Sequence, residues 1–149
     1  MEDSFSINEL KDRFNENLND VDAAVSLGNY YYDIGDPAQA ISYYLRALAI
    51  DPDMSGVRTD LGTMYWRNND IGLSEQAFRE VIARDPGFGQ AYVNLGLLLQ
   101  RERLDADGAM AIWQQLLDVA PDHALANKAR ELLGLPVVLS SFSFSSTLR

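Results

Sequence analysis

Apolar residues near the start of the chain recur with the period of an amphipathic helix. The positions that share one helical stripe are Ile7, Leu10, Phe14 and Leu18. Ser6 and Glu9 have the spacing of a capping box, a pair of side chains that satisfies the first free backbone N–H groups of a helix. The pattern therefore predicts a short amphipathic helix over 7–18, within an N-terminal segment of residues 1–20.

A second pattern repeats at a fixed interval along most of the chain. Leu-Gly pairs begin at Leu27, Leu61 and Leu95, which are 34 residues apart. Pro52 and Pro86 keep the same interval, and each follows an aspartate. Self-similarity at one period is typical of a repeat architecture, in which each unit buries its apolar face against its neighbours.

Start and stop signals divide each repeat into two helices. An aspartate before a helix accepts hydrogen bonds from the first turn, and a proline disfavours helical conformation in the residue before it. The predicted helices run from Asp20 to Gly35, and over 37–50, 55–68, 71–84, 89–102 and 106–119. They form three units, at 21–54, 55–88 and 89–121. The sequence thus predicts an all-α protein.

One further helix is predicted after the third unit. It covers 122–133, begins at Asp122, and stops at Gly134 with Pro136 shortly beyond, which is a typical helix end. Its unpaired position and polar surface suit a solubilising cap, so we treat 122–134 as a capping helix.

The last residues, 135–149, have a different character. Phe and Ser alternate there with period two, and β-branched and aromatic residues favour an extended chain. Two interpretations stay open: a disordered Ser/Phe tail, or docking of 137–149 in an extended form into a groove of the same or a neighbouring molecule.

The repeated residues resemble the tetratricopeptide repeat (TPR) family, whose 34-residue motif orders Trp, Leu, Gly, Tyr, Ala, Phe, Ala and Pro. The matches in the first repeat are Leu27, Gly28, Tyr31, Ala40, Tyr44, Ala47 and Pro52. Those in the second are Leu61, Gly62, Tyr65, Phe78 and Pro86. The third has Tyr92, Leu95, Gly96 and Ala109, with Leu99 and Trp113 at the aromatic positions.

This resemblance implies a right-handed superhelix of three helix-turn-helix repeats, with an N-terminal helix and a C-terminal capping helix. Glycine at its repeated position is expected where two helix backbones cross too closely for a Cβ. The first helix of each repeat is expected to line a concave groove that binds peptides. Arg67 and Arg101 in that groove are expected to hold acidic groups of the peptide.

The groove residues implied by the resemblance are Asn29, Tyr32, Thr63, Trp66, Arg67, Val93, Leu97, Gln100 and Arg101, together with Asp22, Val25, Asp33, Thr59 and Gln90. Tyr32 and Trp66 share a repeat position that the fold does not require to be aromatic. Aromatic residues are enriched at binding surfaces, which favours a functional groove. The alternative is that these residues are only the solvated face of the helices.

Some members of the family grip a C-terminal carboxylate with a lysine and two asparagines. Asn29 matches one asparagine, but Val25 and Asp60 occupy the positions of the lysine and the second asparagine, so this clamp is not predicted. Residues 61–63 and 121–123 are also similar to repeat domains of bacterial assembly factors, which implies an assembly role only in general terms.

Composition narrows the classes of function. There are 12 Lys and Arg against 22 Asp and Glu, and the net charge of −10 opposes phosphate backbones and favours cationic partners. Nucleic acid binding is therefore not predicted. The chain has no cysteine, hence no disulfide or thiolate metal site. No apolar run approaches the length of a membrane span and no leader is recognisable, so we predict a cytoplasmic protein without membrane insertion.

Catalysis is not predicted either. His123 is the only histidine, and a metal site needs several converging ligands. The aspartates at Asp36, Asp70, Asp105 and Asp122 stand where helices need caps, so no enzyme, metal or cofactor is inferred. Two functions stay open: an adaptor or scaffold that binds a partner peptide in the groove, and a self-assembling structural unit whose C-terminal tail docks into a neighbouring groove.

Overall fold

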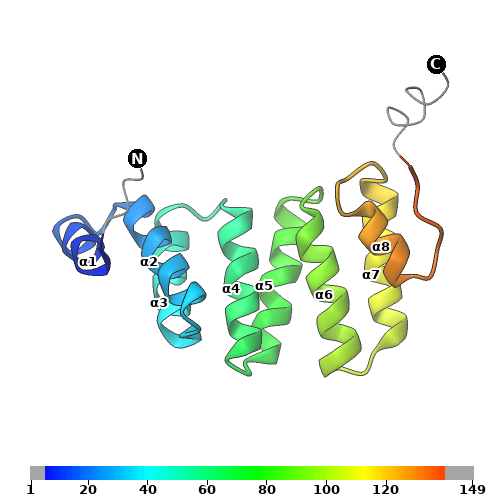
Figure 1. The fold of residues 1–149 in the computed structure, drawn as a ribbon, viewed down its shortest axis with the longest axis horizontal. Coiled ribbons are helices and arrows are strands. Elements are labelled where there is room, and N and C mark those ends of the chain that lie inside the picture. The colour runs from blue at the N-terminus through cyan, green and yellow to red at the C-terminus, as the bar shows by residue number, and fades with distance from the viewer. Residues whose placement is uncertain (1–5, 140–149) are drawn as a thin grey trace, which may run out of the picture.

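The computed structural model describes residues 6–139, which contain eight α-helices and no strand. In chain order the helices are α1 (Ile7–Glu16), α2 (Val21–Asp33), α3 (Pro37–Ile50), α4 (Ser55–Arg67), α5 (Ile71–Arg84), α6 (Gly89–Glu102), α7 (Ala106–Val119) and α8 (Ala126–Leu132). Figure 1 shows them stacked side by side in this order, from α1 at one end to α8 at the other. The predicted all-α fold is confirmed.

The N-terminal helix α1 starts as predicted and ends earlier. Ser6 and Glu9 form the capping box, with the Glu9 N–H donating to Ser6 Oγ at 3.2 Å and the Ser6 N–H to Glu9 Oε2 at 3.3 Å. The predicted end at residue 18 is wrong, because Asn17 has an extended backbone and its Oδ1 accepts the Asn19 N–H at 3.1 Å. Leu18 consequently leaves the apolar stripe and is 65% exposed.

Side-chain caps are present at the starts of three later helices, α2, α3 and α7. The carboxylates of Asp20, Asp36 and Asp105 accept backbone N–H groups at 3.0, 3.3 and 2.8 Å, as expected of N-caps. Asp70 occupies the N-cap of α5, but its carboxylate accepts the Asn68 side-chain amide at 2.8 Å and makes no cap hydrogen bond. Capping by Asp70 was therefore a wrong prediction.

The last helix begins later than the sequence suggested. Residues 121–125 form turns, and α8 starts at Ala126, so the prediction of a helix from Asp122 is wrong. His123 explains the difference, because its Nδ1 accepts the Leu125 N–H at 2.9 Å and its carbonyl accepts the Ala126 N–H at 2.9 Å. The predicted stop at Gly134 is confirmed by its φ of +73°, a conformation that favours glycine.

The apolar core lies between the helices of each pair and continues from one pair to the next. The repeated glycine in the first helix faces the aromatic residue in the second. A Cβ on Gly28 would lie 2.5 Å from the Tyr44 ring, and one on Gly62 would lie 2.5 Å from the Phe78 ring. The sequence had suggested that glycine is needed because two helix backbones cross there. That reason is wrong, because an aromatic side chain, and not a backbone, occupies the space beside the glycine.

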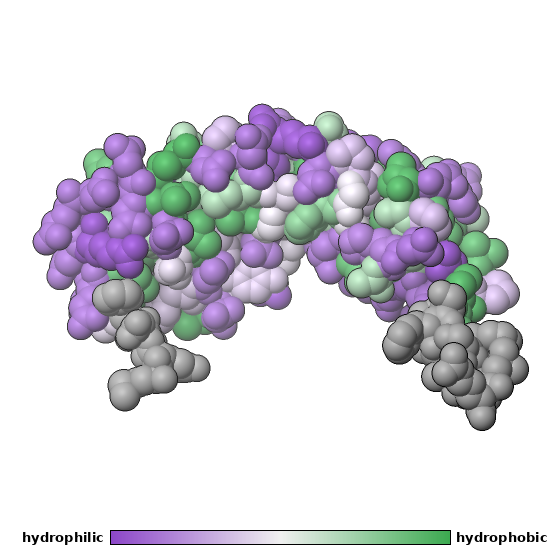
Figure 2. All heavy atoms as spheres, turned by 90° about the horizontal axis from the view of Figure 1, so that it is seen from above, coloured by the Kyte–Doolittle hydropathy of each residue, from purple (hydrophilic) through white to green (hydrophobic). Residues whose placement is uncertain are grey.

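The stack of helices is curved. Seen from above, the molecule forms an arch with one hollowed side (Figure 2). Among the described helices α4 also contacts α6 directly, while no comparable contact joins α3 to α5 or α5 to α7. Helices on the inside of a curve lie closer together than those on the outside. The first helices of the pairs therefore face the hollow.

The chain beyond α8 turns back along that helix. Val138 is bound through its backbone: its N–H donates to Asn127 Oδ1 at 2.8 Å, and its carbonyl accepts the Asn127 side-chain amide at 2.9 Å. The start of the predicted docking segment thus lies on α8 of its own molecule and not in the groove. Residues 140–149, which carry the Phe-Ser alternation, are outside the described residues.

Candidate functional site

Side chains from α2, α4 and α6 surround a cavity of about 400 Å³ that we call the inner pocket. It is lined by Tyr32, Thr59, Asp60, Thr63, Trp66, Gln90 and Asn94. One residue comes from α2, four come from α4 and two from α6. The pocket therefore depends on the packing of three successive helix pairs.

Two aromatic rings of the inner pocket are held in place by charged neighbours. The Trp66 indole N–H donates to Glu102 Oε1 at 2.9 Å, which links α4 to the end of α6. The Arg67 guanidinium lies over the Tyr32 ring, 4.9 Å from the ring centroid, in a cation–π contact between α4 and α2. Both rings remain partly exposed. They offer preformed apolar surface.

Asp60 has a different environment. Its side chain is half-buried, and its carboxylate makes no hydrogen bond or ion pair with any residue in the range 6–139. Burial raises the pKa of Asp60, and the negative charge of Asp33 raises it further. The nearby Tyr44 hydroxyl does not compensate this carboxylate, because it donates to Asn29 Oδ1 at 2.7 Å.

The remaining polar groups of the inner pocket are engaged locally. Thr59 and Thr63 donate their hydroxyls to backbone carbonyls one turn earlier, at 2.8 and 3.3 Å. The Gln90 side-chain amide donates to Asn94 Oδ1 at 2.7 Å. Asn94 keeps its own NH₂ group, and Gln90 its carbonyl oxygen, for further hydrogen bonds.

The structure brings together only part of the predicted groove set. Of the predicted set, Tyr32, Thr59, Thr63, Trp66 and Gln90 line the inner pocket. Arg67 lies against it on the Tyr32 ring. The Oδ1 atom of Asn29 already accepts a hydrogen bond from the Tyr44 hydroxyl, so only its NH₂ group is left for a ligand.

The other predicted groove residues of α6, apart from Gln90, lie outside the inner pocket. Val93 is only 5% exposed and belongs to the core, and Leu97 packs against that core. Gln100 and Arg101 are exposed near the end of α6 and do not line the inner pocket.

Two residues that line the inner pocket, Asp60 and Asn94, were absent from the predicted groove set. They are 34 residues apart and therefore occupy the same repeat position. That shared position was a usable signal, because it lies on the helix next to Thr59 in one repeat and Val93 in the next. The lining face of the helices is simply one position wider than expected.

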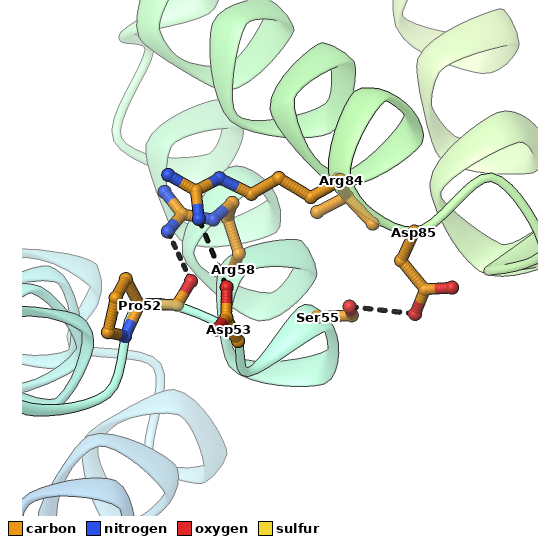
Figure 3. Close-up of a pocket in the computed structure, with 7 residues that line it drawn as sticks. Pro52, Asp53, Ser55, Arg58, Arg84 and Asp85 are labelled. Atoms are coloured by element: carbon orange, nitrogen blue, oxygen red, sulfur yellow. Dashed lines mark hydrogen bonds and ion pairs between the residues drawn. The ribbon is translucent and has the colours of Figure 1, made fainter.

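A second cavity, of about 190 Å³, lies between the turn after α3 and the end of α5. Its polar groups are already paired (Figure 3): Arg58 donates to the Pro52 carbonyl at 2.8 Å, and Ser55 Oγ to Asp85 at 2.8 Å. Arg84 makes an ion pair with Asp53 at 3.2 Å. These contacts fasten successive helix pairs together, so we assign this cavity a structural role.

The described residues contain no group of three His, Cys, Asp or Glu side chains placed to hold a metal ion. His123 instead packs beside Gly89, where a Cβ would lie 2.5 Å from the imidazole ring. Within residues 6–139, every helix is too short or too polar to cross a bilayer.

Residues 26–146 match the family described as the cilia and flagella-associated protein 70 middle TPR-like domain. The chain belongs to this TPR-like family. Because the match covers most of the chain, it includes all three helix pairs from within α2 onward, as well as α8.

Solved structures share the fold of this TPR-like domain. The crystal structure of MamA has a TM-score of 0.71 at 23% identity, over 87% of this chain and 77% of that one. The first TPR of Spaghetti (RPAP3) bound to the HSP90 peptide SRMEEVD has a TM-score of 0.63 at 20% identity, over 75% and 91%. The TPR2B domain of yeast Sti1, in a complex with pHsp70, has a TM-score of 0.67 at 14% identity, over 87% and 98%.

These comparisons confirm the predicted right-handed TPR superhelix with its N-terminal helix and C-terminal capping helix. TPR-like domains are in general protein-interaction modules and not enzymes. Protein binding is therefore the general function class of this fold.

Proposed function

We propose that this TPR-like domain is a non-enzymatic adaptor that binds an extended segment of a partner protein in the inner pocket. The observation that carries the proposal is the pair of rings, Tyr32 and Trp66, fixed by Arg67 and Glu102 beside a cavity of about 400 Å³. Solved relatives of the same fold support it, since two were determined with an HSP90 peptide and with pHsp70.

The chemistry of the inner pocket suits an extended chain. Rings that are already held in place lose little conformational entropy when a ligand covers them, so their burial contributes more fully to affinity. The free amide groups of Gln90 and Asn94 are suited to the backbone of a peptide, which offers both donors and acceptors. Neither arginine is proposed to hold an acidic group of the peptide, as the sequence had suggested. Arg67 stacks on Tyr32, and Arg101 lies outside the inner pocket.

A library of short peptides immobilised on an array tests this proposal with the full chain. We expect Trp66→Ala to lower binding of the retained peptides at least tenfold, because a central aromatic anchor is removed. Tyr30→Ala is the matched control, since Tyr30 is a partly exposed aromatic of α2 that does not line the inner pocket. Equal binding by both variants and the unmodified chain would contradict the proposal.

The alternative function, self-assembly through the C-terminal tail, stays a prediction. Val137, Val138 and Leu139 are exposed and apolar, and Val138 already engages Asn127 on α8. This supports a role of the tail in contacts, while residues 140–149 are outside the described range. The cytoplasmic location and the absence of nucleic acid partners also stay predictions.

A further inference from the structure

We propose that the inner pocket selects partner segments that place a lysine or arginine side chain against the Asp60 carboxylate. This inference rests on the proposed function and adds the chemistry of the partner. The sequence had suggested an acidic peptide, held by Arg67 and Arg101. The present proposal is a basic one.

Asp60 belongs to α4, the helix that contributes most of the lining of the inner pocket. It lines the inner pocket together with the aromatic residues Tyr32 and Trp66. It is half-buried yet has no hydrogen-bond donor and no cation among residues 6–139. A partly desolvated carboxylate without a partner gains most from an incoming cation that also donates hydrogen bonds.

Each helix that forms the inner pocket contributes to the charge around it. The α2 helix contributes Asp33, whose charge acts on Asp60, and α6 contributes Glu102, bound to Trp66. Within residues 6–139, the cation in contact with a lining residue is Arg67 of α4, which lies over the Tyr32 ring. Negative charge therefore predominates around the inner pocket. An acidic group of a ligand would be repelled by the Asp60 carboxylate, which has no cation beside it among residues 6–139.

Tyr44 of α3 lies close enough to Asp60 to be affected by its charge. Burial raises the pKa of Tyr44, and the charges of Asp60 and Asp33 raise it further, so the phenol stays neutral. Its hydroxyl hydrogen is directed to Asn29. The second helix of the first pair thus adds no positive charge to the inner pocket.

The position of the inner pocket indicates that the cation it receives comes from a side chain of the partner and not from the partner's N-terminus. The inner pocket lies within the stack, with α1 before α2 and α7 and α8 after α6 (Figure 1). A segment that crosses it in an extended form continues in both directions and presents a side chain there. The exposed part of the Trp66 ring fits the same ligand, because aromatic faces attract ammonium and guanidinium groups.

Pools of short peptides with acetylated N-termini and amidated C-termini provide the test. One central residue is fixed as lysine, arginine, glutamate or norleucine, and the flanking positions are degenerate. We expect the lysine and arginine pools to bind the full chain roughly tenfold more tightly than the norleucine pool, with glutamate weakest, since a charge-assisted hydrogen bond has about this effect. Asp60→Asn should abolish the preference, whereas Asp107→Asn, the same charge change at an exposed position of α7, should leave it intact.

The outcomes separate the two proposals. If the pools bind and Trp66→Ala weakens all of them, but the fixed residue has no effect, the basic specificity is wrong and the proposed function stands. If the preference for lysine and arginine survives in Asp60→Asn, the assignment to Asp60 is overturned. If no pool binds, both proposals fail.

Discussion

Trp66 of α4 donates its indole N–H to the Glu102 carboxylate of α6 across 2.9 Å, although the two residues are 36 positions apart in the chain. The contact joins the first helices of two successive pairs on the side where α4 and α6 approach each other. It sets the orientation of the larger ring of the inner pocket. The proposed peptide site and the packing of successive helix pairs are therefore connected at this hydrogen bond.

We expect Glu102→Ala to affect binding more than folding. An exposed charge-assisted hydrogen bond contributes less than about 1 kcal/mol to the free energy of unfolding, so urea denaturation should show only a small loss. Peptide affinity should fall several-fold because the Trp66 ring is no longer held. Glu102→Gln keeps an acceptor and should bind almost normally. A loss well above 2 kcal/mol in Glu102→Ala would instead show that the residue serves mainly to fasten the helices.

Gly62→Ala tests the packing of glycine against the aromatic ring. A Cβ at this position would lie 2.5 Å from Phe78, so the ring must shift, and overpacking of a core costs about 1 to 3 kcal/mol. The better helix propensity of alanine offsets up to about 1 kcal/mol of this. Urea denaturation should therefore show a net destabilisation.

Gly72→Ala is the matched control for this prediction. Gly72 also lies in a helix, but its nearest neighbour to a new Cβ is the end of the Arg103 side chain, at 3.9 Å. This variant should be neutral or slightly stabilised. If Gly62→Ala is also stabilised, the Phe78 ring has room to move and the proposed reason for the glycine is incorrect.

Asp60→Asn should raise stability at neutral pH. Folding raises the pKa of Asp60, so the ionised carboxylate is disfavoured in the folded protein above that pKa. The destabilisation disappears when the pH falls below the ordinary value of 3.8, where Asp60 is protonated in both the folded and unfolded states. The stability difference between the variant and the unmodified chain should therefore shrink as the pH is lowered from 7 towards 3.8.

Asp20→Asn provides the opposite sign in the same experiment. The Arg13 hydrogen bond lowers the pKa of Asp20, so its ionised form stabilises the folded protein above 3.8 and the effect is lost as the pH falls through the lowered folded pKa. Asparagine is also a good N-cap, so the change isolates the charge. We expect this variant to be less stable at neutral pH. Equal pH profiles for both variants would contradict the two assignments.

The amide of Val138 should exchange with solvent more slowly than a free amide. It is bound to Asn127 Oδ1 at 2.8 Å, and hydrogen exchange measured by NMR reports this contact. Asn127→Ala should raise the exchange rate to that of an unprotected chain. Asn127→Asp keeps the acceptor and should retain most of the protection. Fast exchange in the unmodified protein would show that the segment does not stay on α8.

Removal of residues 137–149 tests the self-assembly alternative. If the tail joins molecules, multi-angle light scattering should find a smaller mass for the shortened chain than for the full chain at the same concentration. The cut lies beyond Gly134, so it leaves all eight described helices intact. An unchanged mass would remove self-assembly through the tail as a function.

Local signals were enough to predict most helices from the sequence. The predicted spans 37–50, 71–84, 89–102 and 106–119 coincide with α3, α5, α6 and α7. Capping carboxylates and the 34-residue period act within one or two helices, so their effect is visible in a single repeat. The errors at Leu18 and Asp122 also have local causes, in side-chain hydrogen bonds of Asn17 and His123 that compete with helix.

The inner pocket was only partly predictable, because it depends on how successive pairs are packed. The repeat position of Tyr32 and Trp66 was readable from the sequence, and both line the pocket. The burial of Val93 depends on packing against the core of neighbouring helices, which no single helix records. Asp60 shares its repeat position with Asn94, so that position could have been included from the sequence. The sequence by itself determined the repeat and its helices, whereas tertiary packing alone decided which side chains share the cavity and left Asp60 without a partner there.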